Sequence, residues 1–336
     1  MDELSRVAIV GAGRMGRGIA QSCALAGVPA LLIDLKPRSP ADAAALQAAV
    51  HVELMRDLDF LVNAGLLERA RVAAIASLVD VRPAAEVGAS LQSYELVFEG
   101  VPETLAAKQE ALQWVAGHAR SDAIIASTTS TMDVNQLAQL TQGPERFLNA
   151  HWLNPAHLMP LVELSVGAKT DPGVTARIRG MLKALGKITV VCGASPGYIV
   201  PRIQALAMNE AARLVEEGAA TPEDIDTAVR VGFGLRFAIL GLLEFIDWGG
   251  NDILYYASGH LSSTIDAARY RPPDIVEHNM RQGRNGLRDG LGFYDYTGMD
   301  VQAYRDKKLS QFVGLIGHLG LLPPGLKAAG KPSDVA

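Results

Sequence analysis

Residues 6–16 read Arg-Val-Ala-Ile-Val-Gly-Ala-Gly-Arg-Met-Gly, and this stretch decides the fold. The apolar, β-branched run 6–10 predicts a short buried strand, and the glycines at 11, 13 and 16 follow it directly. Met15, Ile19 and Cys23 are then spaced four residues apart, which predicts a helix. A second apolar run, 30–33, ends at Asp34. The order is therefore strand, glycine turn, helix, strand and acid.

This order is typical of a dinucleotide-binding unit. Gly11 allows the tight turn, Gly13 lets the backbone approach a pyrophosphate, and Gly16 lets the helix pack against the strand. We expect these glycines and the intervening Arg14 and Met15 to contact the cofactor. Asp34 can bond the ribose hydroxyls and repel a 2′-phosphate, which favours NAD over NADP despite Lys36 and Arg38 nearby. The alternative is a Rossmann-like turn that binds no nucleotide.

Composition describes an ordinary globular protein with room for two domains. The chain has 336 residues, 49% hydrophobic and 20% charged, with a formal net charge of −5. The acidic balance and scattered arginines give no reason to expect a nucleic-acid partner. The longest apolar stretch, 231–246, contains Arg236 and Glu244, so we expect no membrane span. Met1-Asp2-Glu3 does not resemble a signal peptide, so we expect a cytoplasmic protein.

Strands and helices alternate up to about residue 194. A predicted helical hairpin (about 40–76) follows the second strand, a further helix is predicted over 83–91, and the alternation thereafter implies a parallel, doubly wound sheet. Beyond the Gly-Ala-Ser-Pro-Gly segment 193–197 only long helical patterns remain, including one that predicts a single helix over 242–263. We therefore expect an α/β fold: a Rossmann-type NAD-binding domain (1–194), an all-helical substrate and dimerisation domain (195–320), and a flexible tail (321–336).

Three polar residues fall at or just past predicted strand ends, where ligands bind in such sheets: Ser130, His151 and Glu163. A histidine with a carboxylate partner is a common general base near neutral pH, and a nearby hydroxyl can bond the substrate oxygen. The spacing alone leaves a second interpretation open, in which His151 is a satisfied strand-end residue and Glu163 is solvated.

Several segments together resemble the 3-hydroxyacyl-CoA dehydrogenase family. They occur in the family's order over nearly the whole chain: 11–20, 101–108, 127–130, 151–163 and 195–202. The resemblance implies that His151 takes the proton from the C3 hydroxyl as hydride passes to NAD. It also implies that Glu163 orients the imidazole and that Ser130, near the cofactor, bonds the reacting oxygen.

The resemblance extends to further cofactor contacts and to the assembly. Asn154, Glu103 and Lys108 match the family's cofactor-contacting positions, although Glu103 and Lys108 could also be a surface pair on a helix. Arg288 stands where the family usually has a lysine. The family implies a homodimer and a small-molecule substrate, and no metal is expected.

Two departures put an acyl-CoA substrate in question. The family's usual P-G-F-I-x-N-R motif reads here Pro-Gly-Tyr-Ile-Val-Pro-Arg (196–202), so that Pro201 replaces an asparagine of the active-site network. Acyl-CoA members also carry lysines in the inserted hairpin that meet the CoA phosphates. Here the hairpin has no lysine and offers only Arg56, Arg69 and Arg71.

A third departure points to a substrate class. Residues 154–160 and 232–238 are more similar to the gulonate, carnitine and pyridine-carboxylate dehydrogenases of the same superfamily, which act on small free acids. Arg236 could hold such a carboxylate by a two-point bond, or it could be a surface or dimer-contact residue.

We therefore predict an NAD-dependent enzyme that interconverts a secondary alcohol and a ketone. A small free hydroxy acid is slightly favoured over a 3-hydroxyacyl-CoA such as 3-hydroxybutyryl-CoA. A non-catalytic NAD-binding structural or sensor protein is the remote alternative, since Ser130, His151 and Glu163 are all present.

Overall fold

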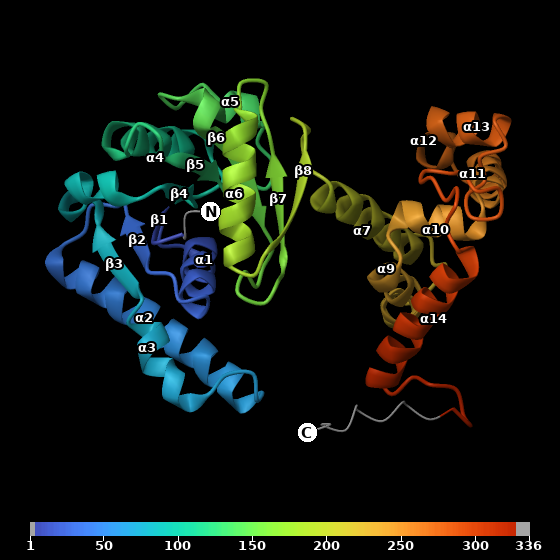
Figure 1. Ribbon diagram of the computed structural model, residues 1–336, viewed down its shortest axis with the longest axis horizontal. Coiled ribbons are helices and arrows are strands. Elements are labelled where there is room, and N and C mark those ends of the chain that lie inside the picture. Colours follow the sequence, from blue (N-terminus) through green and yellow to red (C-terminus); the bar gives the residue numbers. More distant parts are fainter. Residues whose placement is uncertain (1–3, 327–336) are drawn as a thin grey trace. The chain divides into compact units, whose positions relative to one another are not determined.

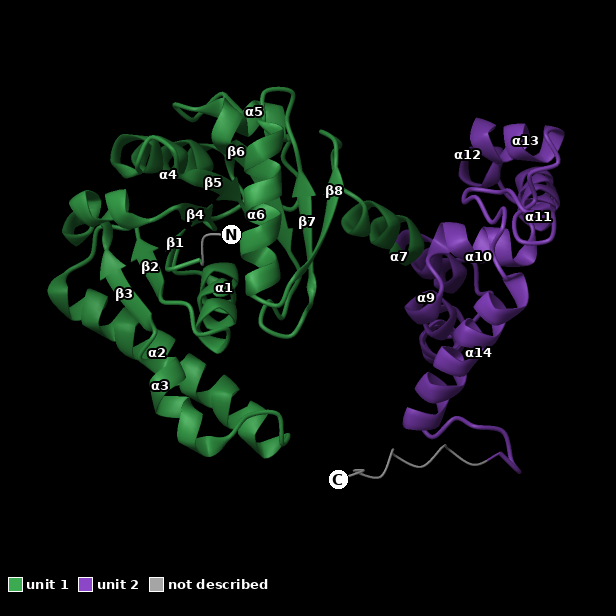
Figure 2. Cartoon of the chain, in the orientation of Figure 1, with its two compact units in different colours: residues 1–208 green, residues 209–336 purple. Residues whose placement is uncertain are grey.

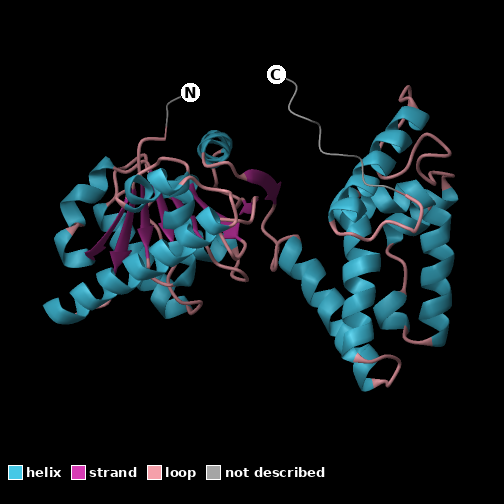
Figure 3. Cartoon of the chain, turned by 90° about the horizontal axis from the view of Figure 1, so that it is seen from below, coloured by secondary structure: helices cyan, strands magenta, loops and turns pink. Residues whose placement is uncertain are grey.

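The computed structural model describes residues 4–326, which divide after residue 208 into two compact units (Figure 2). The first unit contains all eight strands, while the second consists of helices and loops (Figure 3). The predicted flexible tail lies only partly within the described residues: 321–326 form no helix, and 327–336 lie outside them.

One eight-stranded sheet has the order β3-β2-β1-β4-β5-β6-β7-β8 (Figure 1). The strands are β1 (Val7–Val10), β2 (Ala30–Asp34), β3 (Val79–Pro83), β4 (Leu96–Glu99), β5 (Ile124–Ser127), β6 (Phe147–Trp152), β7 (Leu161–Ser165) and β8 (Ile188–Cys192). Neighbouring strands from β3 to β6 pair in parallel, with β1 at the point where the order reverses. This is the expected doubly wound arrangement, whose ligands bind at the carboxyl ends of the strands.

The sheet differs from the prediction in one respect: β7 runs antiparallel to β6, and β8 pairs in parallel with β7. The connection between β6 and β7, residues 153–160, contains no helix. A parallel return needs a crossover of about a dozen residues or more, so this short connection forces the strand to turn back.

Helices cover both faces of the sheet. The helices of this part of the chain are α1 (Arg14–Leu25), α2 (Pro40–Asn63), α3 (Val72–Ala76), α4 (Leu105–His118), α5 (Val134–Ala138) and α6 (Pro172–Ala184), with 3-10 turns at Arg69–Arg71, Ala84–Glu86, Gly88–Ser93 and Pro144–Arg146. Apolar side chains of α1 and α6 pack on one face, and those of α4 and α5 on the other. The segment predicted as a helix after Pro83 is two 3-10 turns instead. The inserted α2 and α3 pack on each other through Leu58 and Ile75.

The remaining helices are α7 (Val200–Glu216), α8 (Pro222–Ala228), α9 (Gly234–Ile239), α10 (Leu242–Gly249), α11 (Asn251–Thr264), α12 (Ala267–Tyr270), α13 (Asp274–Arg281) and α14 (Val301–His318), with a π-helical turn at Val229–Phe233. The single helix predicted over residues 242–263 is broken into α10 and α11 at Gly250, whose φ of +117° favours glycine. No helix within residues 4–326 is both long and apolar enough to cross a membrane.

Candidate functional site

The glycine turn after β1 has the geometry that a bound pyrophosphate needs. Gly11 has a φ of +112°, and a Cβ there would lie 2.6 Å from the Gly100 carbonyl oxygen. A Cβ on Gly16 would lie 2.0 Å from the Gly11 carbonyl oxygen, so that glycine keeps α1 against the strand. A Cβ on Gly13 would meet no atom within 4 Å, which leaves open space where the backbone faces the cavity.

The N-terminus of α1 can bind an anion. Its N-cap is Gly13, which provides no side-chain cap, and its first turn holds no acidic residue. The first N–H groups are therefore free to bond a phosphate. A cavity of about 530 Å³ adjoins them and is lined by Gly11, Gly13, Arg14, Asp34 and Arg38 among others. Met15 instead packs against the core. The residues present fit an NAD molecule.

Asp34 ends β2 at this cavity, 7% exposed, and is ion-paired with Arg38. We expect Asp34→Ser to weaken NAD binding by roughly 10- to 100-fold, the loss for charged hydrogen bonds, and to narrow the gap to NADP. Titration of wild type and variant with NADH and NADPH measures both effects. A wild-type protein that binds NADPH as tightly as NADH would contradict the role of Asp34.

Ser130 lies three residues beyond β5, exposed, in a segment anchored by Glu103. The Glu103 Oε1 accepts hydrogen bonds from the backbone N–H of Ser130 (2.9 Å) and of Thr131 (3.2 Å), and from the Thr129 hydroxyl. Burial would raise the pKa of Glu103, but these bonds and Lys108 outweigh it and lower that pKa. Glu103 thus holds the Ser130 segment as a charged carboxylate.

Lys108 is fully buried, so the surface-pair alternative does not describe it. Its Nζ lies 3.1 Å from both carboxylate oxygens of Glu99 and 3.4 Å from Oε2 of Glu103. Ser127 also donates to Glu99. The sequence analysis did not single out Glu99, although a glutamate that ends an apolar strand four residues before Glu103 is a signal that could have revealed it.

The antiparallel turn brings His151 and Glu163 together. They are directly opposed in the register of β6 and β7, with His151 Nδ1 2.8 Å from Glu163 Oε2. Glu163 therefore lies in the middle of its strand rather than at the end where the sequence analysis placed it. Both side chains are buried, which excludes the interpretation of Glu163 as a solvated residue.

Every oxygen of the Glu163 carboxylate is used. Oε2 faces His151, and Oε1 accepts from the backbone N–H groups of Ile199 (3.0 Å) and Val200 (2.9 Å). Burial would raise the pKa of Glu163, but the bond with His151 and these two N–H groups outweigh it and lower that pKa. Because an ionised carboxylate only accepts, His151 Nδ1 carries a proton and Nε2 is left free to act as a base.

Pro201 leaves this network intact. It lies in the first turn of α7, where a backbone N–H has no helical partner in any case. The two N–H groups that hold Glu163 precede it in the chain. Proline at this position therefore removes the asparagine side chain of the usual motif without removing a backbone donor that the carboxylate uses.

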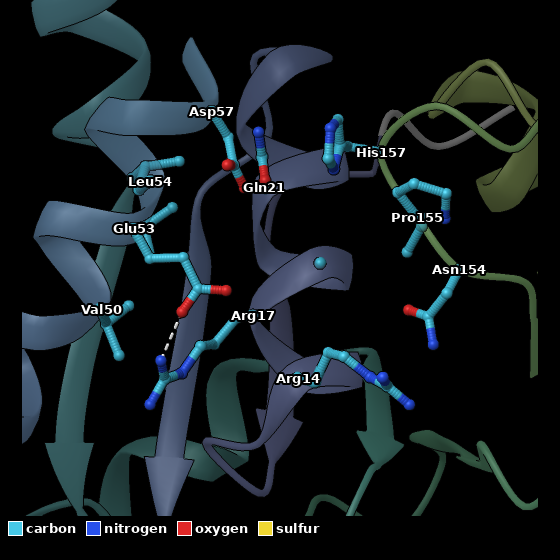
Figure 4. A pocket seen from close by; sticks show the side chains of 13 residues that line it. Arg14, Arg17, Gln21, Val50, Glu53, Leu54, Asp57, Asn154, Pro155 and His157 are labelled. Atoms are coloured by element: carbon cyan, nitrogen blue, oxygen red, sulfur yellow. Dashed lines mark hydrogen bonds and ion pairs between the residues drawn. The ribbon is translucent and has the colours of Figure 1, made fainter. Parts of the chain in front are cut away.

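A second cavity, of about 260 Å³, lies between α1, α2 and the loop that carries Asn154 (Figure 4). Arg14, Arg17 and Gln21 of α1 face it from one side, and Glu53 and Asp57 of α2 from the other. Arg17 is ion-paired with Glu53, and none of the lining residues is a lysine. Asn154 and Arg14 both line this cavity, so Asn154 lies near the start of α1 although the two residues are far apart in the sequence.

The other two predicted site residues belong to the second unit. Arg236 of α9 is exposed, has its guanidinium 5.8 Å from the centre of the Phe245 ring, and lines a cavity of about 150 Å³. Arg288 is half-exposed and ion-paired with Asp252 at 2.7 Å. Within residues 4–326 no cluster of three or more histidine, cysteine or acidic side chains could hold a metal ion.

The doubly wound sheet, the glycine turn and Asp34 define an NAD-binding domain, and the family that matches this chain consists of NAD-dependent dehydrogenases that act on CH–OH groups. The family models for the 3-hydroxyacyl-CoA dehydrogenase NAD-binding domain and C-terminal domain match residues 6–195 and 197–296. The chain belongs to the 3-hydroxyacyl-CoA dehydrogenase family.

The relatives include a 3-hydroxybutyryl-CoA dehydrogenase and a dehydrogenase named for a free pyridine-carboxylate. The chain is 33% identical to a 3-hydroxybutyryl-CoA dehydrogenase of Mycobacterium tuberculosis, over 88% of this chain and 99% of that one. It is 28% identical to the 5-formyl-3-hydroxy-2-methylpyridine 4-carboxylate 5-dehydrogenase of Mesorhizobium japonicum, over 93% of this chain and 97% of that one. Among solved structures, a 3-hydroxyacyl-CoA dehydrogenase from Archaeoglobus fulgidus has a TM-score of 0.74 at 30% identity and covers 95% of this chain and 100% of its own.

Proposed function

We propose that the protein interconverts the secondary alcohol and the ketone of a compact hydroxy acid that carries a free carboxylate. The buried His151–Glu163 pair carries the catalytic part of this proposal, because a 2.8 Å bond to an ionised carboxylate prepares the imidazole as a base. In the oxidation, the glycine turn and Asp34 would hold NAD, which would supply the hydride acceptor for the carbinol carbon. His151 Nε2 takes the hydroxyl proton, and the Ser130 hydroxyl donates to the reacting oxygen.

The charges of the hairpin argue against a CoA ester. Arg56 is ion-paired with Asp57 at 3.1 Å, and Arg69 with Asp59, so two of its three arginines already face carboxylates. The cavity beside α2 presents Glu53 and Asp57 and no lysine. Arg14 and Arg17 line the same cavity, so its formal charges balance and it offers CoA phosphates no excess of positive charge.

The cavity beside Arg236 suits a carboxylate on an apolar body. Its walls include Phe245, Trp248 and Phe312, and Lys308 is its second cation. Lys308 is ion-paired with Glu244 at 2.7 Å, whereas Arg236 makes no ion pair with any residue in 4–326. A free guanidinium can bind a carboxylate through two parallel hydrogen bonds.

A 3-hydroxyacyl-CoA remains the second candidate, and the higher identity to the 3-hydroxybutyryl-CoA dehydrogenase favours it. The name of the Mesorhizobium japonicum relative, a pyridine-carboxylate dehydrogenase, supports the free acid. We further propose that residues 1–194 bind NAD, that residues 195–320 bind substrate and form a homodimer, and that the protein is cytoplasmic.

A substrate panel separates the two candidates. NADH absorbance is followed with 3-hydroxybutyryl-CoA, carnitine, gulonate and aromatic hydroxy acids, and we expect kcat/KM to be higher for a free acid. Arg236→Ala should raise KM for that acid about 10-fold or more, with a smaller effect on kcat, since a charged hydrogen-bonded pair is lost. Arg230→Ala is the matched control, because Arg230 is an exposed arginine that is paired with Asp226. A CoA ester that is better by tenfold would overturn the proposed substrate class.

A further inference from the structure

Tyr198 lies between β8 and α7 and is 4% exposed. Its φ of +46° is in the left-handed region, and among the described residues other than glycine it alone has a positive φ. A bulky residue keeps this conformation only where its surroundings hold it there, and such residues concentrate at functional sites. The contacts of this side chain show what holds it.

The ring of Tyr198 stacks on the imidazole of His151. The two ring centres are 5.1 Å apart and the planes differ by 18°. Glu163 bonds the edge of the same imidazole, at Nδ1. The edge contact alone would let the imidazole rotate about the Nδ1–carboxylate direction, whereas the stack fixes its plane and so the direction in which Nε2 points.

The hydroxyl of Tyr198 joins the two segments that carry the reacting groups. It donates to the Thr129 carbonyl oxygen (2.8 Å) and accepts from the Asn149 amide Nδ2 (3.1 Å). Thr129 immediately precedes Ser130, and Asn149 lies two residues before His151 on β6. Thr129 and Asn149 are both fully buried, so water cannot replace the hydroxyl if it is removed.

The motif that this segment resembles has phenylalanine at this position, which can stack but cannot make either hydrogen bond. We infer that Tyr198 is a positioning residue, which fixes the plane of the His151 imidazole by its ring and the separation of His151 and Ser130 by its hydroxyl. The backbone N–H groups of the next two residues hold Glu163 as well. This inference rests on the proposed function, because it requires His151 to act as the base.

Tyr198→Phe and Tyr198→Leu test the hydroxyl and the ring separately. Turnover is measured in the reductive direction on the ketone that corresponds to the best substrate of the panel, with NADH and with NADH deuterated at the transferred position. We expect Tyr198→Phe to lower kcat by about 5- to 30-fold, the size of one or two buried hydrogen bonds, with KM and NADH affinity unchanged. The deuterium isotope effect on kcat should rise, because misplaced groups slow hydride transfer itself. Tyr198→Leu should lower kcat further.

Two further variants make the result specific. Asn149→Ala removes one partner of the hydroxyl, so its effect on kcat and that of Tyr198→Phe should be less than additive in the double variant. Tyr270→Phe, which loses a hydroxyl bonded to Glu210 in the second unit, should leave kcat and the isotope effect at wild-type values. If Tyr198→Phe keeps the wild-type kcat and isotope effect, or if Tyr270→Phe loses as much activity, the inference about Tyr198 is wrong while the proposed function stands. Full turnover in a His151→Ala variant would overturn the proposed function and the inference with it.

Discussion

Replacement of His151 with alanine should lower turnover by about 10²- to 10⁴-fold, the usual contribution of general acid–base catalysis. The variant loses the imidazole that Glu163 orients at 2.8 Å, and within residues 4–326 no other histidine is hydrogen-bonded to a carboxylate. NAD affinity should change little, because the glycine turn and Asp34 that we expect to bind the cofactor lie on other strands. Steady-state kinetics on the best panel substrate and direct titration with NADH measure the two quantities.

Glu163→Gln is the companion variant, since it keeps the size of the side chain and removes the charge. It should lower kcat and shift its pH profile, because the imidazole loses the ionised partner that stabilises its protonated form. If both variants retain wild-type turnover, the assignment of base and partner is wrong.

The lowered pKa of Glu163 also has a consequence for stability. A carboxyl whose pKa is lower in the folded protein stabilises it at pH values above the unfolded pKa, about 4.3 for glutamate. That contribution is lost as the pH falls through the lowered folded value. The difference in the free energy of unfolding between wild type and Glu163→Gln should therefore decrease as the pH falls below about 4.3. Urea titrations across this range measure the difference.

The sequence predicted the fold where local patterns decide it. Strand, turn, helix and acid over residues 6–34 are all found, as β1, α1 and β2 with Asp34 at the end. The reversal of β7 was missed because the direction of a strand depends on the length and path of the connection before it, here 153–160. The break at Gly250 was missed because the apolar pattern continues across it, and only the backbone conformation of glycine ends α10.

The site shows the same division between local and long-range information. His151 and Glu163 could be proposed as partners because they lie twelve residues apart across one turn. Tyr198 could not be connected with them, because its hydroxyl meets Asn149 and Thr129, which are 49 and 69 residues away. Lys108 illustrates the limit of helical spacing. It lies four residues after Thr104, the N-cap of α4, and a residue at that position could be either exposed or fully buried.

Gly13→Ala should weaken NAD binding by roughly 10- to 100-fold and leave the fold unchanged. The φ of Gly13 is −80°, which alanine adopts without strain, and an added Cβ would meet no protein atom within 4 Å. The same Cβ would point into the space that a pyrophosphate must enter to reach the first N–H groups of α1. Each charged hydrogen bond lost there is worth about 1.5–3 kcal/mol, which gives the expected range.

Gly16→Ala is the matched control because it adds the same Cβ atom to the same turn, but at a position where the fold has no room for it. Its Cβ would lie 2.0 Å from the Gly11 carbonyl oxygen, so α1 must shift and the melting temperature should fall. Titration with NADH and thermal unfolding distinguish the two: Gly13→Ala should lose affinity at constant melting temperature, and Gly16→Ala should lose both. A Gly13→Ala variant that binds NADH as wild type does would show that the backbone of this turn does not approach the pyrophosphate, and the phosphates would then have to bind elsewhere along the 530 Å³ cavity.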